Sequence, residues 1–245
     1  MIGVPQERDS SVDNPKPSAS ETLMEQSAQV YTIAKSSGDI LSLEKRREKV
    51  VKLREIILPE QRSPEWFKMR ENRLTASDLA AALGECAYKS RDKTIVEKCG
   101  ERTFFGNAIT EWGVKYEPVA TAIYEKRTKS EVIEFGLMPH NTIPFLGASP
   151  DGITTDGIML EIKCPPNRQI TGIVPHGYWV QMQLQLEVCD LNECDYLECN
   201  IKEYDNEQEF INDTSAIFKS LFVDLIRRRK VKALKLVKHF CSIFR

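Results

Sequence analysis

The sequence lacks the features of a membrane-bound or secreted protein. It has no apolar run of about 20 residues, the length that a membrane-spanning helix needs. Its first residues, Met1-Ile-Gly-Val-Pro-Gln-Glu-Arg, contain no apolar core of the kind found in secretory signals. We therefore expect an intracellular protein, in the cytoplasm or nucleus, that is not secreted and has no membrane partner.

The chain also has little net charge and no paired cysteine motif. Its formal net charge is −2, so any contact with nucleic acid must come from a local basic patch. The 7 cysteines include no Cys-x-x-Cys pair, and an odd number without a disulfide spacing favours a reducing compartment. Cys189, Cys194 and Cys199 fit no iron–sulfur spacing and are expected to be buried strand thiols. His140 and His176 have no partner at metal-ligand spacing.

What is present is an ordinary globular composition, with 41% hydrophobic and 29% charged residues. At 245 residues the chain can form one α/β domain or two small ones. Residues 1–40 are rich in Ser, Pro, Asn and acids, which predicts a disordered polar extension. We expect the folded domain over 41–225 and a basic C-terminal helix or tail over 226–245.

Hydrophobic periodicity and helix-capping residues predict the order of helices and strands. Helices are expected over 41–58, from Ser63, over 75–84, 109–126 and 178–188, and from Glu207 onward. Strands are expected over 131–137, 145–148, 152–154, 157–163 and 193–201. This order favours an α/β (α+β) fold with a central mixed sheet flanked by helices.

The most informative segment carries Asp151 in a turn, followed by Glu161 and Lys163 on the next strand. Residues i and i+2 of a strand point to the same face, so Glu161 and Lys163 should project together beside Asp151. Two carboxylates can bind a hard divalent cation, and a neighbouring lysine can orient or deprotonate a water. These groups are the minimum for metal-assisted phosphodiester hydrolysis.

The alternative is that these charges are a solvated surface pair, which is common on exposed strands. The flanking residues argue against it. Ile158, Leu160 and Ile162 alternate with the polar positions and indicate one core face, which should also receive Cys164. The polar face is therefore expected to be half-enclosed.

Two helices contribute further polar candidates. Glu117 lies late in the expected helix over 109–126 and is either a solvated side chain or a third carboxylate ligand. Tyr178 and Gln181 share a helix face at spacing i, i+3. Gln181 either satisfies a buried backbone group or holds the attacking water or a phosphate oxygen.

Upstream, Arg70 and Ser77 lie close to an expected helix start at Thr75-Ala-Ser77. A helix start offers free N–H groups to a phosphate, and arginine adds bidentate hydrogen bonds. The simpler alternative is that Ser77 caps the helix while Arg70 pairs with Glu71 or Asp78. By spacing alone, this alternative is favoured.

Three interpretations of the basic C-terminus, Arg227-Arg-Arg-Lys-Val-Lys, have equal weight. It can be a solvated helix face, a contact with the DNA backbone that makes binding salt-dependent, or a localisation signal.

Together, the motifs resemble the lambda-type alkaline exonucleases, the YqaJ-like viral recombinase branch of the PD-(D/E)XK nuclease superfamily. The resemblance covers roughly residues 63 to 201 and rests on five segments in the family order. These segments are Trp66…Arg70…Thr75-Ala-Ser77, Trp112-Gly-Val-Lys-Tyr-Glu117, Ser149-Pro-Asp151-Gly, Glu161-Ile-Lys163-Cys-Pro and Tyr178-Trp-Val-Gln181. Each segment is weak alone, and the ordered set is specific.

The resemblance implies a role for each matching residue. Metal contacts would come from Glu117, Asp151, Glu161 and Ile162, with Glu117 the less central acid. Lys163 would orient or activate the water, with Gln181 and Tyr178 beside it. Arg70, Ser77 and Ser149 would bind the 5′-terminal phosphate. Nearby cations would lower the pKa of Lys163 and nearby carboxylates would raise it, so the sequence does not define its protonation state.

The implied activity is a magnesium-dependent 5′-to-3′ exonuclease on linear double-stranded DNA, using two Mg²⁺ ions or Mn²⁺ in their place. It would leave 3′ single strands for recombination or genome processing, with a single-strand annealing protein as partner. The family also implies a homo-oligomeric ring. Two alternatives stay open: a structure-specific or single-strand endonuclease on the same scaffold, and a DNA-binding recombination module without catalysis.

Overall fold

The protein is described here by a computed structural model that covers residues 41–71, 73–99, 108–201, 203–212 and 223–229. The expected disordered extension over 1–40 and the basic tail beyond 229 lie outside these residues. In the described part, no helix is both long enough and apolar enough to cross a membrane.

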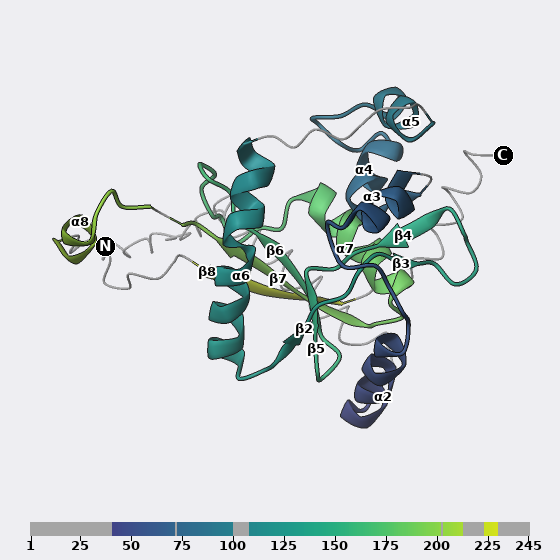
Figure 1. The fold of residues 1–245 in the computed structure, drawn as a ribbon, viewed down its shortest axis with the longest axis horizontal. Helices are drawn as coiled ribbons and strands as arrows, with labels where there is room; N and C mark the ends of the chain where they lie inside the picture. Colours follow the sequence, from purple (N-terminus) through teal and green to yellow (C-terminus); the bar gives the residue numbers. More distant parts are fainter. Residues whose placement is uncertain (1–40, 72, 100–107, 202, 213–222, 230–245) are drawn as a thin grey trace, which may run out of the picture. The chain divides into compact units, whose positions relative to one another are not determined.

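A mixed five-stranded sheet forms the centre of the described domain (Figure 1). Its strand order is β2 (Val132–Ile133), β5 (Gly152–Thr154), β6 (Met159–Lys163), β7 (Glu193–Cys199) and β8 (Val223–Arg229). The β6–β7 pair is parallel and the other pairs are antiparallel. A second sheet has the order β1 (Leu74–Thr75), β4 (Leu146–Ala148) and β3 (Met138–Pro139). The mixed sheet with flanking helices confirms the expected fold class.

Most helices begin and end close to where the sequence predicts, but the helix over Arg91–Cys99 was not expected. They are α2 (Leu43–Arg54), α3 (Pro64–Glu71), α4 (Ala76–Ala82), α5 (Arg91–Cys99), α6 (Ala108–Thr128), α7 (His176–Val188) and α8 (Glu207–Asn212). The hydroxyl of Ser63 accepts the N–H of Trp66 at 3.2 Å and caps α3. Gly84 follows α4 with φ +78°, a left-handed conformation that glycine adopts without strain.

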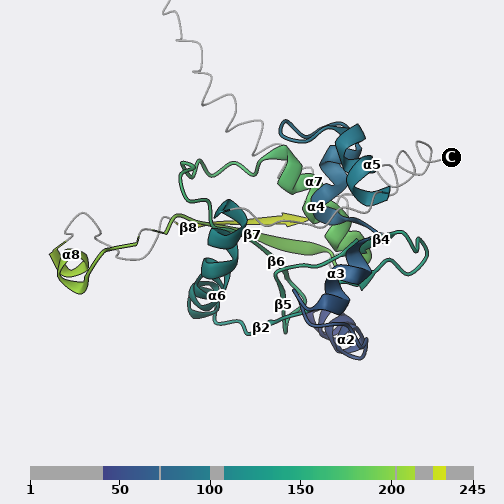
Figure 2. The ribbon, with the colours of Figure 1, turned by 45° about the horizontal axis from the view of Figure 1, so that its top comes forward.

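Helices α6 and α7 cover opposite faces of the central sheet (Figures 1 and 2). On one face, Met159 packs with Met182 and Leu186 of α7. On the other, Leu160 and Ile162 pack with Ala120 and Tyr124 of α6. Because β6 is covered on both sides, its polar face is more enclosed than expected.

The structure corrects three secondary-structure expectations. The strand expected over 131–137 is only Val132–Ile133, and the two-residue strands β1 and β3 were not expected. The helix expected from Glu207 onward is wrong over Val223–Arg229, which is strand β8. The local charge pattern could not reveal that β7 leaves an edge open for antiparallel pairing. The boundary expected at 225/226 therefore falls inside a strand.

Candidate active site

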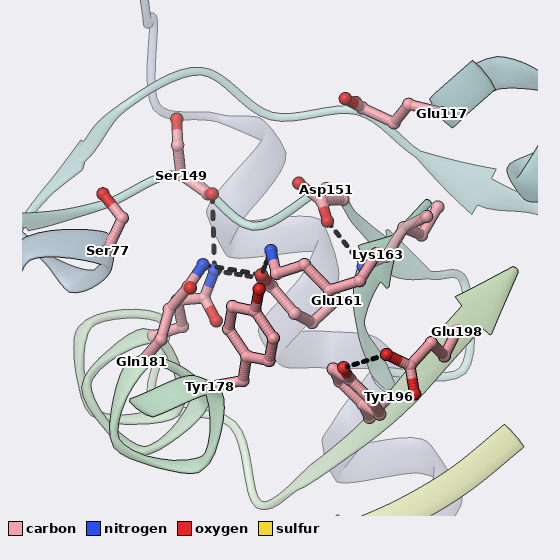
Figure 3. Close-up of polar contacts among 12 residues, drawn as sticks. Ser77, Glu117, Ser149, Asp151, Glu161, Lys163, Tyr178, Gln181, Tyr196 and Glu198 are labelled. Carbon is pink, nitrogen blue, oxygen red and sulfur yellow. Dashed lines mark hydrogen bonds and ion pairs between the residues drawn. The ribbon is translucent and has the colours of Figure 1, made fainter. Parts of the chain in front are cut away.

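The β5–β6 hairpin brings Asp151, Glu161 and Lys163 together (Figure 3). The Asp151 carboxylate accepts the backbone N–H of Ile162 at 2.6 Å, which fixes the turn against β6. Lys163 and Glu161 project from the same face, and the Lys163 ammonium pairs with Glu161 Oε1. The juxtaposition predicted from strand alternation is present. Ile162 and Cys164 are buried on the opposite face with Leu160, also as predicted.

Helix α7 supplies two amide donors to Glu161, whose side chain is fully buried. Gln181 Nε2 donates to Glu161 Oε1 at 2.6 Å, and Gln185 Nε2 donates to Oε2 at 2.7 Å. The Tyr178 ring, on the same helix face, lies 5.0 Å from the Lys163 ammonium. Sequence reasoning found Gln181 and Tyr178 but missed Gln185. The spacing i, i+4 from Gln181 was the available signal.

Glu117 is separate from the other acids. It lies on α6, and Figure 3 shows no polar contact between it and Asp151 or Glu161. Its carboxylate instead accepts a hydrogen bond from Arg62 Nη2 at 2.6 Å. Among the described residues, no three acidic, histidine or cysteine side chains are arranged to hold a metal ion. Asp151, Glu161 and Glu117 therefore lie in the same part of the fold, but their carboxylates are not arranged around one common point.

Burial and repulsion between carboxylates give Asp151 and Glu117 unusual proton affinities. Burial, then the Glu161 charge, raises the pKa of Asp151 well above its ordinary value. Burial also raises the pKa of Glu117, although Arg62 opposes the effect. Burial acts to lower the pKa of Lys163, but Glu161 and Asp151 outweigh it and raise the pKa. In this state Lys163 is a cation.

This charge balance tests whether a divalent cation would fit. Two adjacent carboxylates, Asp151 and Glu161, share one ammonium in a desolvated setting, and Glu117 adds to the repulsion on Asp151. Oxygen ligands with excess negative charge are what Mg²⁺ and Mn²⁺ bind. The donor set therefore fits a hard cation, provided that Glu117 leaves Arg62.

A second cluster joins Arg70, Ser77 and Ser149 through two intermediaries. Trp66 Nε1 donates to Ser149 Oγ at 3.1 Å, and the Arg70 guanidinium lies 4.4 Å from the Trp66 ring. Arg70 Nη2 donates to Thr75 Oγ1 at 3.3 Å, and the Thr75 and Ser77 hydroxyls are 3.2 Å apart. The three residues singled out from the sequence are thus held in one network. Trp66 and Thr75 were within the motif, but their linking roles were missed.

The simpler alternative, in which Ser77 caps α4 and Arg70 pairs with Glu71 or Asp78, is supported only in part. Asp78 acts electrostatically on Arg70, but burial outweighs it and lowers the pKa of Arg70. The Asp78 carboxylate accepts hydrogen bonds from Thr75 at 3.0 Å and from Lys89 at 3.0 Å. No side-chain cap bond forms at the start of α4. Ser77 therefore does not cap α4, and its hydroxyl contacts that of Thr75.

Sequence reasoning also missed a charged group behind Tyr178. Arg168 pairs with Glu198 of β7, and its Nη1 lies 3.4 Å from the Tyr178 hydroxyl. The Tyr196 hydroxyl donates to Glu198 Oε1 at 3.3 Å (Figure 3). Glu198 lies opposite Lys163 in the parallel β6–β7 register. That register depends on long-range pairing, so no local pattern could have predicted it.

The structure shows where the remaining cysteine and histidine candidates lie. Cys189, Cys194 and Cys199 are buried as expected, but only Cys194 and Cys199 lie on a strand, because Cys189 ends helix α7. His140 Nδ1 accepts the backbone N–H of Thr142 at 3.1 Å and so stabilises its own turn.

Comparison with known proteins defines the family. Residues 65–192 of the 245 match the YqaJ-like viral recombinase domain. The chain belongs to this family, as the ordered motifs had indicated, and its fold is that of the PD-(D/E)XK-type alkaline exonucleases.

Among solved structures, it is similar to the alkaline exonuclease LHK-Exo from Laribacter hongkongensis. That match has 30% identity and a TM-score of 0.59, and covers 74% of this chain and 90% of LHK-Exo. LHK-Exo in complex with dAMP gives 28% identity, a TM-score of 0.60 and the same coverage.

Viral proteins are similar to it in sequence. The uncharacterized protein R354 of Acanthamoeba polyphaga mimivirus is 38% identical over 181 residues, which are 66% of this chain and 33% of R354. Protein D345L of African swine fever virus is 30% identical over 155 residues, 51% of this chain and 45% of D345L. The chain spans about a third of the length of R354 and under half of that of D345L.

Proposed function

We propose that this chain is a metal-dependent DNA exonuclease that hydrolyses one strand of linear duplex DNA from its 5′ end. The family and the similarity to LHK-Exo support the nuclease class. One observation supports the end specificity: Ser149 belongs to both clusters. Its hydroxyl accepts the Trp66 hydrogen bond, and its carbonyl accepts one from Gln185 Nε2 at 3.4 Å.

Ser149 also precedes Asp151 by two residues, so the two clusters are coupled over a very short stretch of chain. A 5′-terminal phosphate held by Arg70, Ser77 and Ser149 would place the next phosphodiester towards Asp151. Arginine suits this task because its planar fork binds phosphate through paired hydrogen bonds. Capture of the end therefore converts a general phosphodiesterase site into one that starts at a terminus.

Asp151, Glu161, Glu117 and the main chain of Ile162 would hold the metal, as one or two Mg²⁺ ions or Mn²⁺. When bound, the cation would polarise a phosphate oxygen and make a coordinated water more acidic. Lys163, a cation in this structure, would donate hydrogen bonds that orient the water or a phosphate oxygen. Gln181 would hold Glu161 in place, and the Tyr178 ring would limit movement of the Lys163 ammonium.

The proposed direction has consequences for partners. Degradation from the 5′ end leaves a 3′ single strand, which is the substrate of a single-strand annealing protein. We place the activity in the domain that begins at about residue 41 and includes strand β8, which contains the family match, and extend the proposal to a homo-oligomeric ring around the duplex.

The test is digestion of linear duplex DNA that carries either a 5′-phosphate or a 5′-hydroxyl, with Mg²⁺ or with a chelator. We expect digestion to require the cation and to be faster with the phosphate. Lys163→Ala should abolish it while the fold is retained. Equal digestion of a covalently closed circle would show an endonuclease instead, and undiminished cleavage by Lys163→Ala would contradict the site.

A further inference from the structure

The Arg62 guanidinium forms an ion pair with Glu117, a carboxylate that the proposed function assigns to metal binding. Its Nη2 is 2.6 Å from Glu117 Oε2, and the two side chains are 43% and 24% exposed. Glu117 also interacts electrostatically with Lys163 and Glu161, so it belongs to the charge balance of the hairpin site. A guanidinium and a divalent cation cannot use the same carboxylate oxygen at the same time.

The backbone holds Arg62 in this position. Its φ is 66°, a left-handed conformation that is unfavourable for a residue with a Cβ atom. Gln61 on one side donates to the carbonyls of Phe135 at 2.7 Å and Pro150 at 3.3 Å. Ser63 on the other side caps α3. Arg62 is therefore fixed between two anchored residues, and one of them, Gln61, is bonded to Pro150, the residue before Asp151.

Building on the proposed function, we propose that Arg62 is a resident counter-cation of Glu117 that a divalent cation must displace. Arg62 thereby sets the cation concentration at which Glu117 joins the site. In the metal-free protein the guanidinium offsets part of the negative charge around Asp151. The cation gains Glu117 only by breaking this ion pair, so the pair lowers the apparent affinity of the site.

The geometry favours competition over a purely structural role. A structural ion pair would join the loop to α6 without altering metal binding. Arg62 instead contacts the one candidate acid that stands apart from the hairpin, and its half-exposed side chain has solvent to move into. Partly exposed ion pairs contribute up to about 1 kcal/mol, which corresponds to about fivefold in an equilibrium constant.

The experiment is calorimetric titration of the metal-free full chain with Mn²⁺ at a fixed pH of 8.5. We expect Arg62→Gln to tighten one binding event about three- to fivefold. Arg62→Lys, which keeps the charge, should remain close to the parent protein. The matched control is Arg47→Gln, because Arg47 pairs with Asp156 at 2.9 Å and no candidate site residue is involved. It should leave the titration unchanged.

A double-mutant cycle separates competition at Glu117 from a general change in charge. In a Glu117→Gln background, Arg62→Gln should no longer tighten Mn²⁺ binding. Equal tightening in that background, or none in the single variant, would overturn the proposal while leaving the nuclease assignment standing. If the parent protein binds no Mn²⁺, both the proposal and the metal assignment fail. Arg62→Gly, which suits the left-handed backbone, replaces Arg62→Gln if the latter does not fold.

Discussion

The indole N–H of Trp66 donates to the Ser149 hydroxyl at 3.1 Å, while the face of the same ring lies 4.4 Å from the Arg70 guanidinium. One side chain thus positions two groups of the proposed phosphate pocket. We predict that Trp66→Phe lowers the preference for 5′-phosphate over 5′-hydroxyl ends about three- to tenfold, the effect of losing one hydrogen bond. The measurement is KM on matched duplex substrates.

The control for this change is Trp179→Phe. Trp179 stacks on His176 at 5.8 Å, and the substitution should leave the end preference unchanged. An unaltered preference in Trp66→Phe would mean that Trp66 does not organise the pocket.

The second prediction concerns metal removal and pH. Burial and the Glu161 charge raise the pKa of Asp151, so the folded chain keeps a proton that the unfolded chain loses near pH 4. The Asp151 contribution to stability therefore falls as pH rises above about 4 towards the folded pKa. With a chelator, thermal unfolding should give a lower Tm at pH 8 than at pH 5.5.

A bound cation offsets this charge, so added Mg²⁺ should raise Tm more at pH 8 than at pH 5.5. Asp151→Asn should flatten the pH dependence and abolish most of the Mg²⁺ effect. An equal Mg²⁺ effect in parent and variant would show that the cation binds elsewhere.

The third prediction concerns Asp78, whose contribution to stability changes with pH in the opposite direction to that of Asp151. Burial of Asp78 favours its neutral form, but Lys98 and Lys89 outweigh burial and lower its pKa to about 2. The resulting stability is present above about pH 4 and is lost as pH falls towards 2. We predict that Asp78→Asn costs roughly 1–2 kcal/mol at pH 7 and much less at pH 2.5. Urea unfolding at both pH values would measure the difference, and an equal cost at both would refute it.

The fourth prediction assigns Arg168 a positioning role. Arg168 pairs with Glu198 and lies 5.2 Å from the Tyr178 ring, which in turn faces the Lys163 ammonium. We expect Arg168→Gln to lower kcat about tenfold with KM little changed, because the group acts through Tyr178 on the reacting geometry. Arg168→Lys should restore part of the rate.

Arg46 provides the matched control for Arg168. It pairs with Glu193 at 2.8 Å, at the opposite end of β7 from Glu198. Arg46→Gln should reduce stability without lowering kcat. If Arg168→Gln and Arg46→Gln gave equal kcat values, Arg168 would have no positioning role in the site.

Local sequence reasoning was sufficient for the parts of the site that depend on short spacings. Strand alternation placed Glu161 beside Lys163, and helix spacing placed Tyr178 with Gln181. It failed where partners are distant in sequence. Arg62 meets Glu117 across 55 positions, and Arg168 meets Glu198 across 30. Strand β8 was mistaken for helix for the same reason, because its pairing with β7 is invisible to a local window.

The β5–β6 hairpin has an evolutionary consequence. Asp151, Glu161 and Lys163 lie within 13 residues on one hairpin, whereas Arg70 and Ser77 arrive from α3 and α4. The groups proposed to cut DNA and those proposed to recognise its end are thus encoded by separate stretches of gene, and Ser149 is one of their points of contact. If these proposed roles hold, recombination or drift in the upstream stretch can change which DNA terminus is accepted without altering the proposed hydrolytic centre. A lineage could thereby diversify its substrates while inheriting one unchanged piece of chemistry.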